Sequence, residues 1–169
     1  MSRVAFVVQR YGAGITGGSE SLARAVAERL ATHGLTVEVS DADDVDDGAG
    51  FDGVVVGSSL YAGRWRGSCV RYLKHLVRDG HSGPVWLFHS GPLTDAEAHT
   101  PQDLPRKVAE LADRLDTRDV VTFGGVLSDH PSGFIAKKLA ESMSGDWRDW
   151  SEVEAFADAI AAELGVGRD

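Results

Sequence analysis

Cysteine is almost absent from this chain of 169 residues, in which Cys69 is the only one. A single thiol excludes an internal disulfide and the usual cysteine-rich metal cluster. None of the six histidines stands at a spacing typical of metal ligands. The single cysteine also indicates a reducing compartment. Because 43% of the residues are apolar, we expect a chain that folds around its own hydrophobic core.

Basic residues are also scarce, with 17 Lys and Arg against 26 Asp and Glu and a net charge of -9. This balance repels nucleic acid and anionic lipid unless one face is locally basic. No apolar run reaches the roughly 20 residues needed to cross a bilayer, and the first residues lack the layout of a secretion signal. We therefore expect one soluble, cytoplasmic domain over residues 1–169, without nucleic acid and without a transmembrane segment.

Short Val-rich runs alternate with helical patterns along the chain. This alternation is typical of parallel strands joined by crossover helices, with both faces of the sheet covered. Five strands are expected, over residues 4–8, 35–39, 53–57, 84–89 and 120–124. Helices are expected over residues 21–32, 68–77, 104–115 and 151–164, the last with Ser151 and Glu154 spaced as a capping box, and residues 41–50 read as a solvated acidic loop.

Sheets of this kind bind ligands beyond the carboxyl ends of their strands. That rule selects the loops at residues 9–20, 58–67 and 90–102. The first of them is rich in glycine and leads from a strand into a helix. Unpaired N–H groups of a first helical turn favour an anion, so we expect a phosphate there.

Two partial matches to known phosphate sites lie in the first loop. Residues 12–17 spell G-x-G-x-x-G, with Glu38 about twenty residues further on, as in a dinucleotide site. Residues 9–11 and a second glycine pair make the spacing to the strand and helix wrong for that motif. The sequence RYG at residues 10–12, followed by Gly17, Gly18 and Glu20, resembles the opening of two-domain glycosyltransferases, although too little chain follows to hold a second donor domain.

Two other chemistries that share this strand pattern lack their residues. A phosphorelay receiver needs an Asp where Ser58 stands, at the end of the third strand. A hydrolase of the nucleophile-elbow type needs G-x-S-x-G, which the sequence GSSLY at residues 57–61 breaks.

Four segments occur in an order and spacing that point to one family. They are VVVGSSLYAGRW (residues 54–65), VWLFHSGPL (85–93), FGGVL (123–127) and SGDWRDW (144–150). Over residues 50–164 the chain resembles bacterial flavodoxin-domain proteins related to the flavodoxin-like, menaquinone-dependent protoporphyrinogen oxidase. The resemblance implies an α/β, flavodoxin-like fold with strand order 2-1-3-4-5, FMN as cofactor, and oxidoreductase chemistry.

The resemblance also implies which residues hold FMN. The phosphate would meet hydroxyls and backbone N–H groups, and the isoalloxazine ring would lie between the second and third loops, with Tyr61 or Trp65 as a flat wall. The site residues are Thr16, Gly17, Gly18, Ser19 and Ser21 for the phosphate, Ser58, Ser59, Leu60, Tyr61, Ala62, Gly63 and Trp65 in the second loop, and Ser90, Gly91 and Leu93 in the third. Two alternatives stay open: Ser19 as a helix cap, and the loop aromatics as anchors packed on a neighbouring helix.

Three functions are compatible with these residues. One is oxidation of a tetrapyrrole precursor with a quinone as acceptor, the second is electron transfer with a redox partner protein, and the third is a scaffold that has lost FMN because Glu20 opposes the phosphate. An apolar strip, Phe134, Ile135, Leu139 and Met143, could meet a tetrapyrrole, a quinone or a membrane surface, or pack on its own domain. No catalytic residue and no metal site is singled out, and a homodimer stays open.

Overall fold

A parallel sheet of five strands forms the centre of the molecule. The computed structural model describes residues 2–8, 18–60, 62–91, 101–124, 126–127, 145–146 and 148–165. The strands lie in the order β2-β1-β3-β4-β5, which confirms the predicted flavodoxin-like α/β fold. Their bounds are β1 Arg3–Val8, β2 Thr36–Asp41, β3 Gly53–Ser59, β4 Pro84–Ser90 and β5 Asp116–Phe123.

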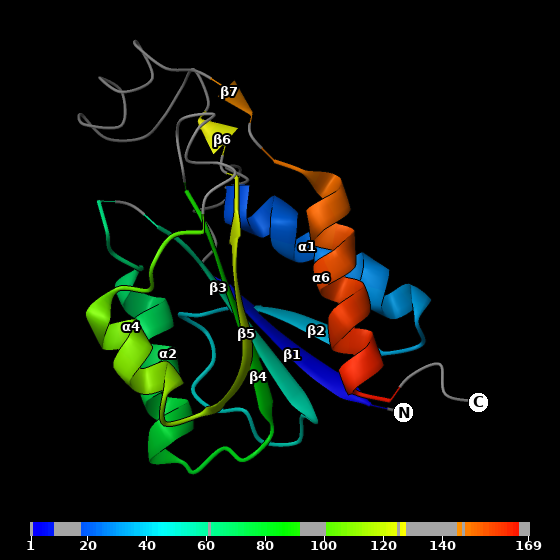
Figure 1. The fold of residues 1–169 in the computed structure, drawn as a ribbon. Helices are drawn as coiled ribbons and strands as arrows, with labels where there is room; N and C mark the ends of the chain where they lie inside the picture. Colours follow the sequence, from blue (N-terminus) through cyan, green and yellow to red (C-terminus); the bar gives the residue numbers. More distant parts are fainter. Residues whose placement is uncertain are drawn as a thin grey trace.

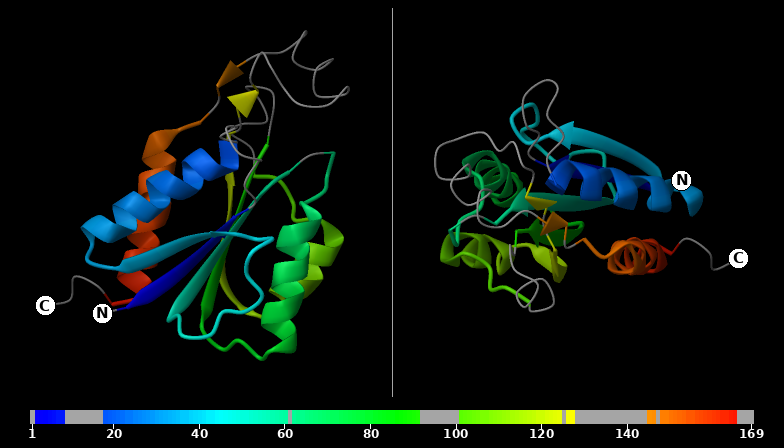
Figure 2. Two further views of the ribbon diagram at one scale, coloured as in Figure 1. Left: turned by 180° about the vertical axis from the view of Figure 1, so that it is seen from behind. Right: turned by 90° about the horizontal axis from the view of Figure 1, so that it is seen from above.

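Helices cover both faces of this sheet (Figure 1). Helices α1 (Gly18–Thr32) and α6 (Trp150–Glu163) lie on one face, and α2 (Gly67–Arg78) and α4 (Arg106–Ala112) lie on the other. Figure 2 shows the same two layers from behind and from above. A two-residue antiparallel pair, β6 (Val126–Leu127) with β7 (Gly145–Asp146), lies beyond the carboxyl end of β5 and precedes α6.

The central strands β1, β3 and β4 are buried on both faces, so each contributes alternate side chains to two cores. On the α1 and α6 face, four aromatic rings pack with centroids 5.6–6.2 Å apart: Phe6, Phe88, Phe123 and Phe156. On the α2 and α4 face, strand valines and leucines pack on the buried face of α2, which includes the buried thiol of Cys69.

One ion-pair cluster joins α1 to α6 across the first layer. The Asp158 carboxylate accepts hydrogen bonds from Arg29 Nε and Nη2 at 2.7 and 3.0 Å, and His33 Nε2 lies 2.7 Å from the same group. The hydrogen bonds from Arg29 and His33 lower the pKa of the Asp158 carboxyl well below its usual range. The pairing links the partly exposed sides of these two helices above their shared apolar core.

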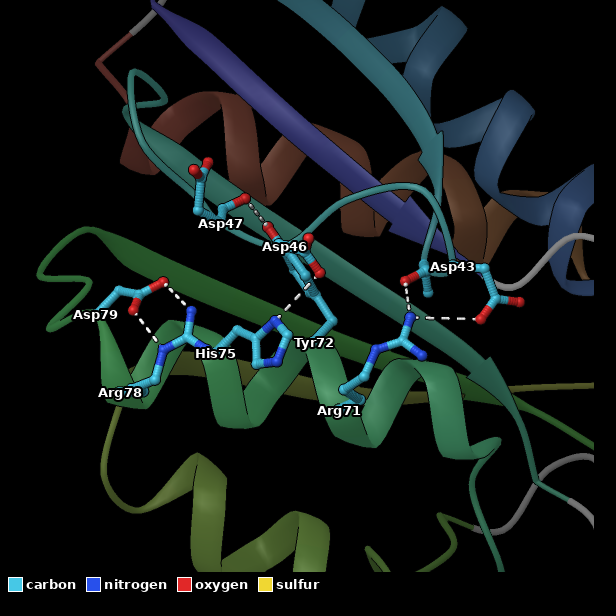
Figure 3. A network of polar contacts seen from close by, with 9 residues as sticks. Asp43, Asp46, Asp47, Arg71, Tyr72, His75, Arg78 and Asp79 are labelled. Carbon is cyan, nitrogen blue, oxygen red and sulfur yellow. Dashed lines mark hydrogen bonds and ion pairs between the residues drawn. The ribbon is translucent and has the colours of Figure 1, made fainter.

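The connection between β2 and β3 was expected to be a solvated acidic loop, and its side chains Asp43, Asp44, Asp46 and Asp47 are exposed as predicted, while part of its backbone packs on α2. Figure 3 shows the connection docked on α2, where the Tyr72 hydroxyl donates to the Asp47 carbonyl at 2.9 Å. Arg71 Nη2 donates to the Ala42 carbonyl at 3.0 Å, and His75 Nδ1 lies 3.4 Å from Asp46 Oδ1. Two carboxylates of the loop, Asp43 and Asp46, face basic side chains of α2, Arg71 and His75.

The prediction of a capping box at the start of α6 is wrong. Asp149 is the N-cap, and its side chain accepts hydrogen bonds from Ser151 N at 2.9 Å and from the Ser151 hydroxyl at 2.6 Å. An Asp at this position satisfies an N–H of the first turn, so the helix begins one residue earlier, at Trp150.

Gly57, in the middle of the sheet, is required by a close approach of an aromatic ring. A Cβ on this residue would lie 2.0 Å from the ring of Phe88, which cannot move because Phe6, Phe123 and Phe156 surround it. We expect Gly57→Ala to lower the free energy of unfolding by about 1–3 kcal/mol in urea titrations. Gly67→Ala, at an open position in the first turn of α2, is the matched control and should change stability by less than about 1 kcal/mol; equal stability of the two variants would contradict the packing argument.

Candidate functional site

Three adjacent strands end in polar residues that lie side by side. Ser58 of β3 pairs in register with His89 of β4, which pairs in turn with Thr122 of β5. On this face of the sheet, the residues two and four positions before Ser58 and before His89 are all valine or leucine. They pack in the core beside α2 and α4. We call Ser58, His89 and Thr122 the polar row; it closes this core at the carboxyl edge of the sheet.

His89 is fully buried at the centre of the polar row. The Trp65 indole Nε1–H donates to His89 Nδ1 at 3.0 Å, and His89 Nε2 lies 2.8 Å from Thr122 Oγ1. An indole nitrogen can only donate, so Nδ1 is the acceptor and the proton of the neutral ring lies on Nε2, which donates to Thr122. Burial lowers the pKa of His89 to about 4, partly offset by the Gln102 backbone, so the imidazole is uncharged near neutral pH.

The other two members of the row bind backbone groups of the neighbouring connections. Ser58 Oγ accepts from Arg66 N at 3.0 Å and donates to the Ser59 carbonyl at 3.0 Å. Thr122 Oγ1 accepts from Gln102 N at 3.0 Å, in the segment that leads into α4. The row therefore holds the connection after β3 and the connection after β4 at defined points.

The connections after β3 and β4 also contact each other directly. Leu60 N donates to the Ser90 carbonyl at 2.7 Å. A Cβ on Gly91 would lie 2.2 Å from the Leu60 carbonyl oxygen, so only glycine allows this approach. Beyond this contact, Ala62 and Gly63 form an exposed turn with φ angles of +48° and +70°.

Trp65 was predicted as a flat wall for a bound ring, and in the structure it is buried. Its side chain is only 6% exposed, belongs to the core beside α2, and meets His89 edge-on with centroids 6.0 Å apart. In this structure Trp65 lies as the alternative describes, as an anchor packed beside a neighbouring helix. Its stacking on a cofactor stays a prediction.

The first turn of α1 lies at the same edge of the sheet (Figure 1). Gly18 and Ser19 open the helix, and Ser21 is half-buried in its first turn. The Glu20 side chain, 7% exposed, accepts a hydrogen bond from Arg24 Nη2 at 3.0 Å, one turn further on. The carboxylate that was expected to oppose a phosphate thus has its charge partly balanced by a guanidinium.

The structure brings most of the predicted ring-binding residues together at the ends of β3 and β4. They are Ser58, Ser59, Leu60, Ala62, Gly63, Trp65, Ser90 and Gly91. Thr16, Gly17, Tyr61 and Leu93, as well as the apolar strip within residues 134–143, lie outside the described residues. The sequence analysis did not predict the roles of His89 and Thr122. A polar residue at an inward-facing position near the end of a strand is the feature that could have indicated them.

Glu38 does not fit the role that a dinucleotide site requires. Its carboxylate accepts a hydrogen bond at 2.6 Å from the Nη2 of Arg3, the first residue of β1. Arg3 begins its strand, whereas an acid that binds a ribose lies at the carboxyl end of the sheet. Glu38 therefore does not lie where such an acid would bind a ribose.

Comparison with known proteins supports this description of the fold. Residues 14–144 match the family model described as a flavodoxin domain, so the chain belongs to the flavodoxin-domain family. No curated protein sequence matches it. The narrower relation to the protoporphyrinogen oxidase is not established by these matches, and neither is the likeness to glycosyltransferases.

Solved structures share the fold over nearly the whole chain. A short-chain flavodoxin associated with a non-canonical PDU bacterial microcompartment matches with a TM-score of 0.65 at 14% identity, covering 98% of this chain and 100% of its own. Oxidised flavodoxin 1 from Bacillus cereus gives 0.60 at 12%, covering 96% and 98%. The apo form of an NADH:FMN oxidoreductase gives 0.62 at 13%, covering 100% and 92%.

Among the helices in the described part of the chain, none combines the length and the apolar character needed to cross a membrane.

The buried neutral His89 makes stability depend on pH. Its pKa is about 4 when folded and about 6.5 when exposed, so between these values the unfolded chain binds a proton that the folded chain does not. We expect the free energy of unfolding to fall as the pH is lowered through this range, by up to about 1.4 kcal/mol per pH unit from this group. Urea titrations at about pH 5 and about pH 7.5 measure the loss.

Variants separate the contribution of His89 from that of other groups. His89→Gln should reduce the loss of stability between the two pH values, because the acidic side chains and the remaining histidines are unchanged. Burial also lowers the pKa of His81, so this residue adds a loss of stability of the same sign. His81→Gln is therefore the control, and it should retain the loss of unfolding free energy that His89 causes between the two pH values. An identical pH dependence in wild type and His89→Gln would contradict this assignment.

Proposed function

We propose that this chain binds FMN at the carboxyl edge of its sheet and acts as a flavin-dependent oxidoreductase. The observation that carries the proposal is the contact between the connections after β3 and β4, where Leu60 N meets the Ser90 carbonyl at 2.7 Å on a sheet of flavodoxin order. This contact joins two of the three loops from which a ligand site at this edge is built. When bound, FMN supplies the ring that accepts and donates electrons.

The described residues at this edge suit a polar, uncharged ring. Ser59 and Gly91 are half-buried, and together with Ser90 they offer hydroxyl and backbone groups to the pyrimidine side of an isoalloxazine. Arg66 Nε lies 3.4 Å from Ser59 Oγ on an exposed side chain, so one cation stands beside the ring position. A cation there favours negative charge on the ring, which reduction of a flavin adds.

The phosphate end of the site rests on the first turn of α1. Gly18, Ser19 and Ser21 belong to this turn, whose backbone N–H groups and dipole attract an anion. Glu20 acts against that attraction, and Arg24 moderates it through their 3.0 Å contact. We infer that FMN binds here with an affinity limited by Glu20, rather than that the chain has lost the cofactor.

A titration with two flavins tests this proposal at the phosphate end. Wild-type protein should quench the fluorescence of FMN and carry its visible absorption through gel filtration. Glu20→Gln should lower the Kd for FMN about fivefold, since a like charge near the phosphate is removed, and leave the Kd for riboflavin unchanged. Glu28→Gln, on the exposed side of the same helix, is the matched control and should change neither Kd.

Two other outcomes of the titration would change this interpretation. An equal effect of Glu20→Gln on FMN and riboflavin would show that Glu20 acts through the fold rather than through the phosphate. Full fluorescence of added FMN with both wild type and Glu20→Gln would overturn the FMN proposal and favour a scaffold without cofactor.

The resemblance to the oxidase family suggests a substrate. We propose a tetrapyrrole precursor as electron donor and a quinone as acceptor, with electron transfer to a redox partner protein as the alternative. The support is positional: the β6–β7 pair lies beyond the carboxyl end of β5, at the edge of the sheet where the flavin site is proposed. A quinone dissolved in a bilayer would bring this edge to a membrane surface, on the cytoplasmic side if the expected location holds.

Anaerobic turnover distinguishes the oxidase from the electron carrier. With protoporphyrinogen and a menaquinone analogue, FMN-loaded protein should produce porphyrin fluorescence faster than free FMN at the same concentration. A rate equal to that of free FMN, together with reduction of the bound flavin by a flavodoxin reductase, would contradict the oxidase function and favour electron transfer.

A further inference from the structure

We infer that the polar row, Ser58, His89 and Thr122, positions the connections after β3 and β4 for ligand binding at the carboxyl edge. The identity of the ligand as a flavin rests on the proposed function. The three side chains lie beneath the edge, so they act through the loops and are positioning residues. Each comes from a different strand, and each holds a group of a connecting segment.

The first argument is the set of groups that the row binds. Ser58 accepts from the backbone of Arg66, His89 accepts from the indole of Trp65, and Thr122 accepts from the backbone of Gln102. The first two fix the end of the β3 connection just before α2, and the third fixes the β4 connection just before α4. His89 Nε2, 2.8 Å from Thr122, links the two connections into one network.

The second argument is the cost of burying polar groups at these positions. His89 and Ser58 are fully buried, where an unpaired polar group costs about 1–3 kcal/mol. Valine or leucine, as found earlier on the same strands, would fill these positions without that cost. Apolar side chains, however, do not set the direction of a loop, whereas a fully paired polar network fixes one arrangement.

The third argument is the shape of the β3 connection. Leu60 is held by Ser90 at one end, and Trp65 and Arg66 are held by the row at the other. Between these anchors, residues 62–64 are exposed, and Ala62 has a φ of +48°, which is unfavourable for a residue with a Cβ. Two fixed ends thus hold a strained turn at the edge where the ring is proposed to lie.

Substitutions at Thr122 test the row with little change in volume. Thr122→Val removes the hydroxyl that Gln102 N and His89 Nε2 meet, and Thr122→Ser retains it. We expect Thr122→Val to speed hydrogen exchange of the Gln102 amide about tenfold and to raise the Kd for FMN about tenfold, while Thr122→Ser stays near wild type. Both are measured well below the midpoint of thermal unfolding, with circular dichroism confirming the folded state.

A second substitution tests the row from the other connection. Trp65→Phe retains an aromatic ring and removes the indole N–H that donates to His89. We expect it to raise the Kd for FMN and to leave the exchange of the Gln102 amide near wild type, because Thr122 still accepts from Gln102. This pattern differs from a general loss of stability, which would speed exchange throughout the sheet.

The outcomes distinguish this inference from the proposed function. If wild type binds FMN and Thr122→Val and Thr122→Ser bind it equally well, the positioning role is overturned and the FMN proposal stands. If wild type binds no FMN, the exchange of Gln102 decides: faster exchange in Thr122→Val alone supports the positioning role for a different ligand. Unchanged exchange in both variants overturns the role.

Discussion

Burial of the central strands on both faces is the constraint on which this structure depends. Because β1, β3 and β4 are covered by helices on either side, their side chains must be apolar along nearly their whole length. Polar side chains can enter only where the strands end and the helices diverge to leave connecting segments. The polar row stands at that boundary, so the same burial that forms the core also concentrates hydrogen-bonding groups at one edge.

Much of the fold follows from that constraint and could be predicted from the sequence. The short apolar runs of β1, β3 and β4 predict buried strands, because a continuous apolar run of this length is typical of a strand that is covered on both faces. The edge strand β5 begins at Asp116, four residues before its expected start, because its first residues, Asp116, Arg118 and Asp119, are exposed and resemble a loop. Pairing with the backbone of β4, rather than side-chain pattern, makes them a strand.

The helix starts show a similar limit. Helix α4 begins at Arg106, after Pro105, two residues later than the apolar pattern suggests. Helix α6 begins at Trp150 because Asp149 reaches Ser151 N, although Ser151 and Glu154 have the spacing of a capping box. Several residues near a helix start can cap it, and the direction of the incoming chain decides which one does.

Part of the candidate site could likewise be predicted from the sequence, and part could not. The rule that ligands bind beyond the carboxyl ends of parallel strands selected the loops after β3 and β4, the resemblance supplied the ligand, and the structure places residues of both loops side by side. The links of His89 to Trp65 and Thr122 span 24 and 33 residues, and no local pattern joins positions so far apart. Strand periodicity could have shown that Ser58 and His89 face inward, but only the register across three strands shows that they form one row.

The direction of the hydrogen bonds in the row has a consequence for charge at the edge. The indole donates to the imidazole, and the imidazole donates to the threonine hydroxyl, so an added proton on His89 would set two N–H groups against each other. Burial lowers the pKa of His89, and the neutral ring keeps Nδ1 as the acceptor for the Trp65 indole. The row orients its loops without contributing charge, whereas Glu20, Arg24 and Arg66 are charged side chains at this edge of the sheet.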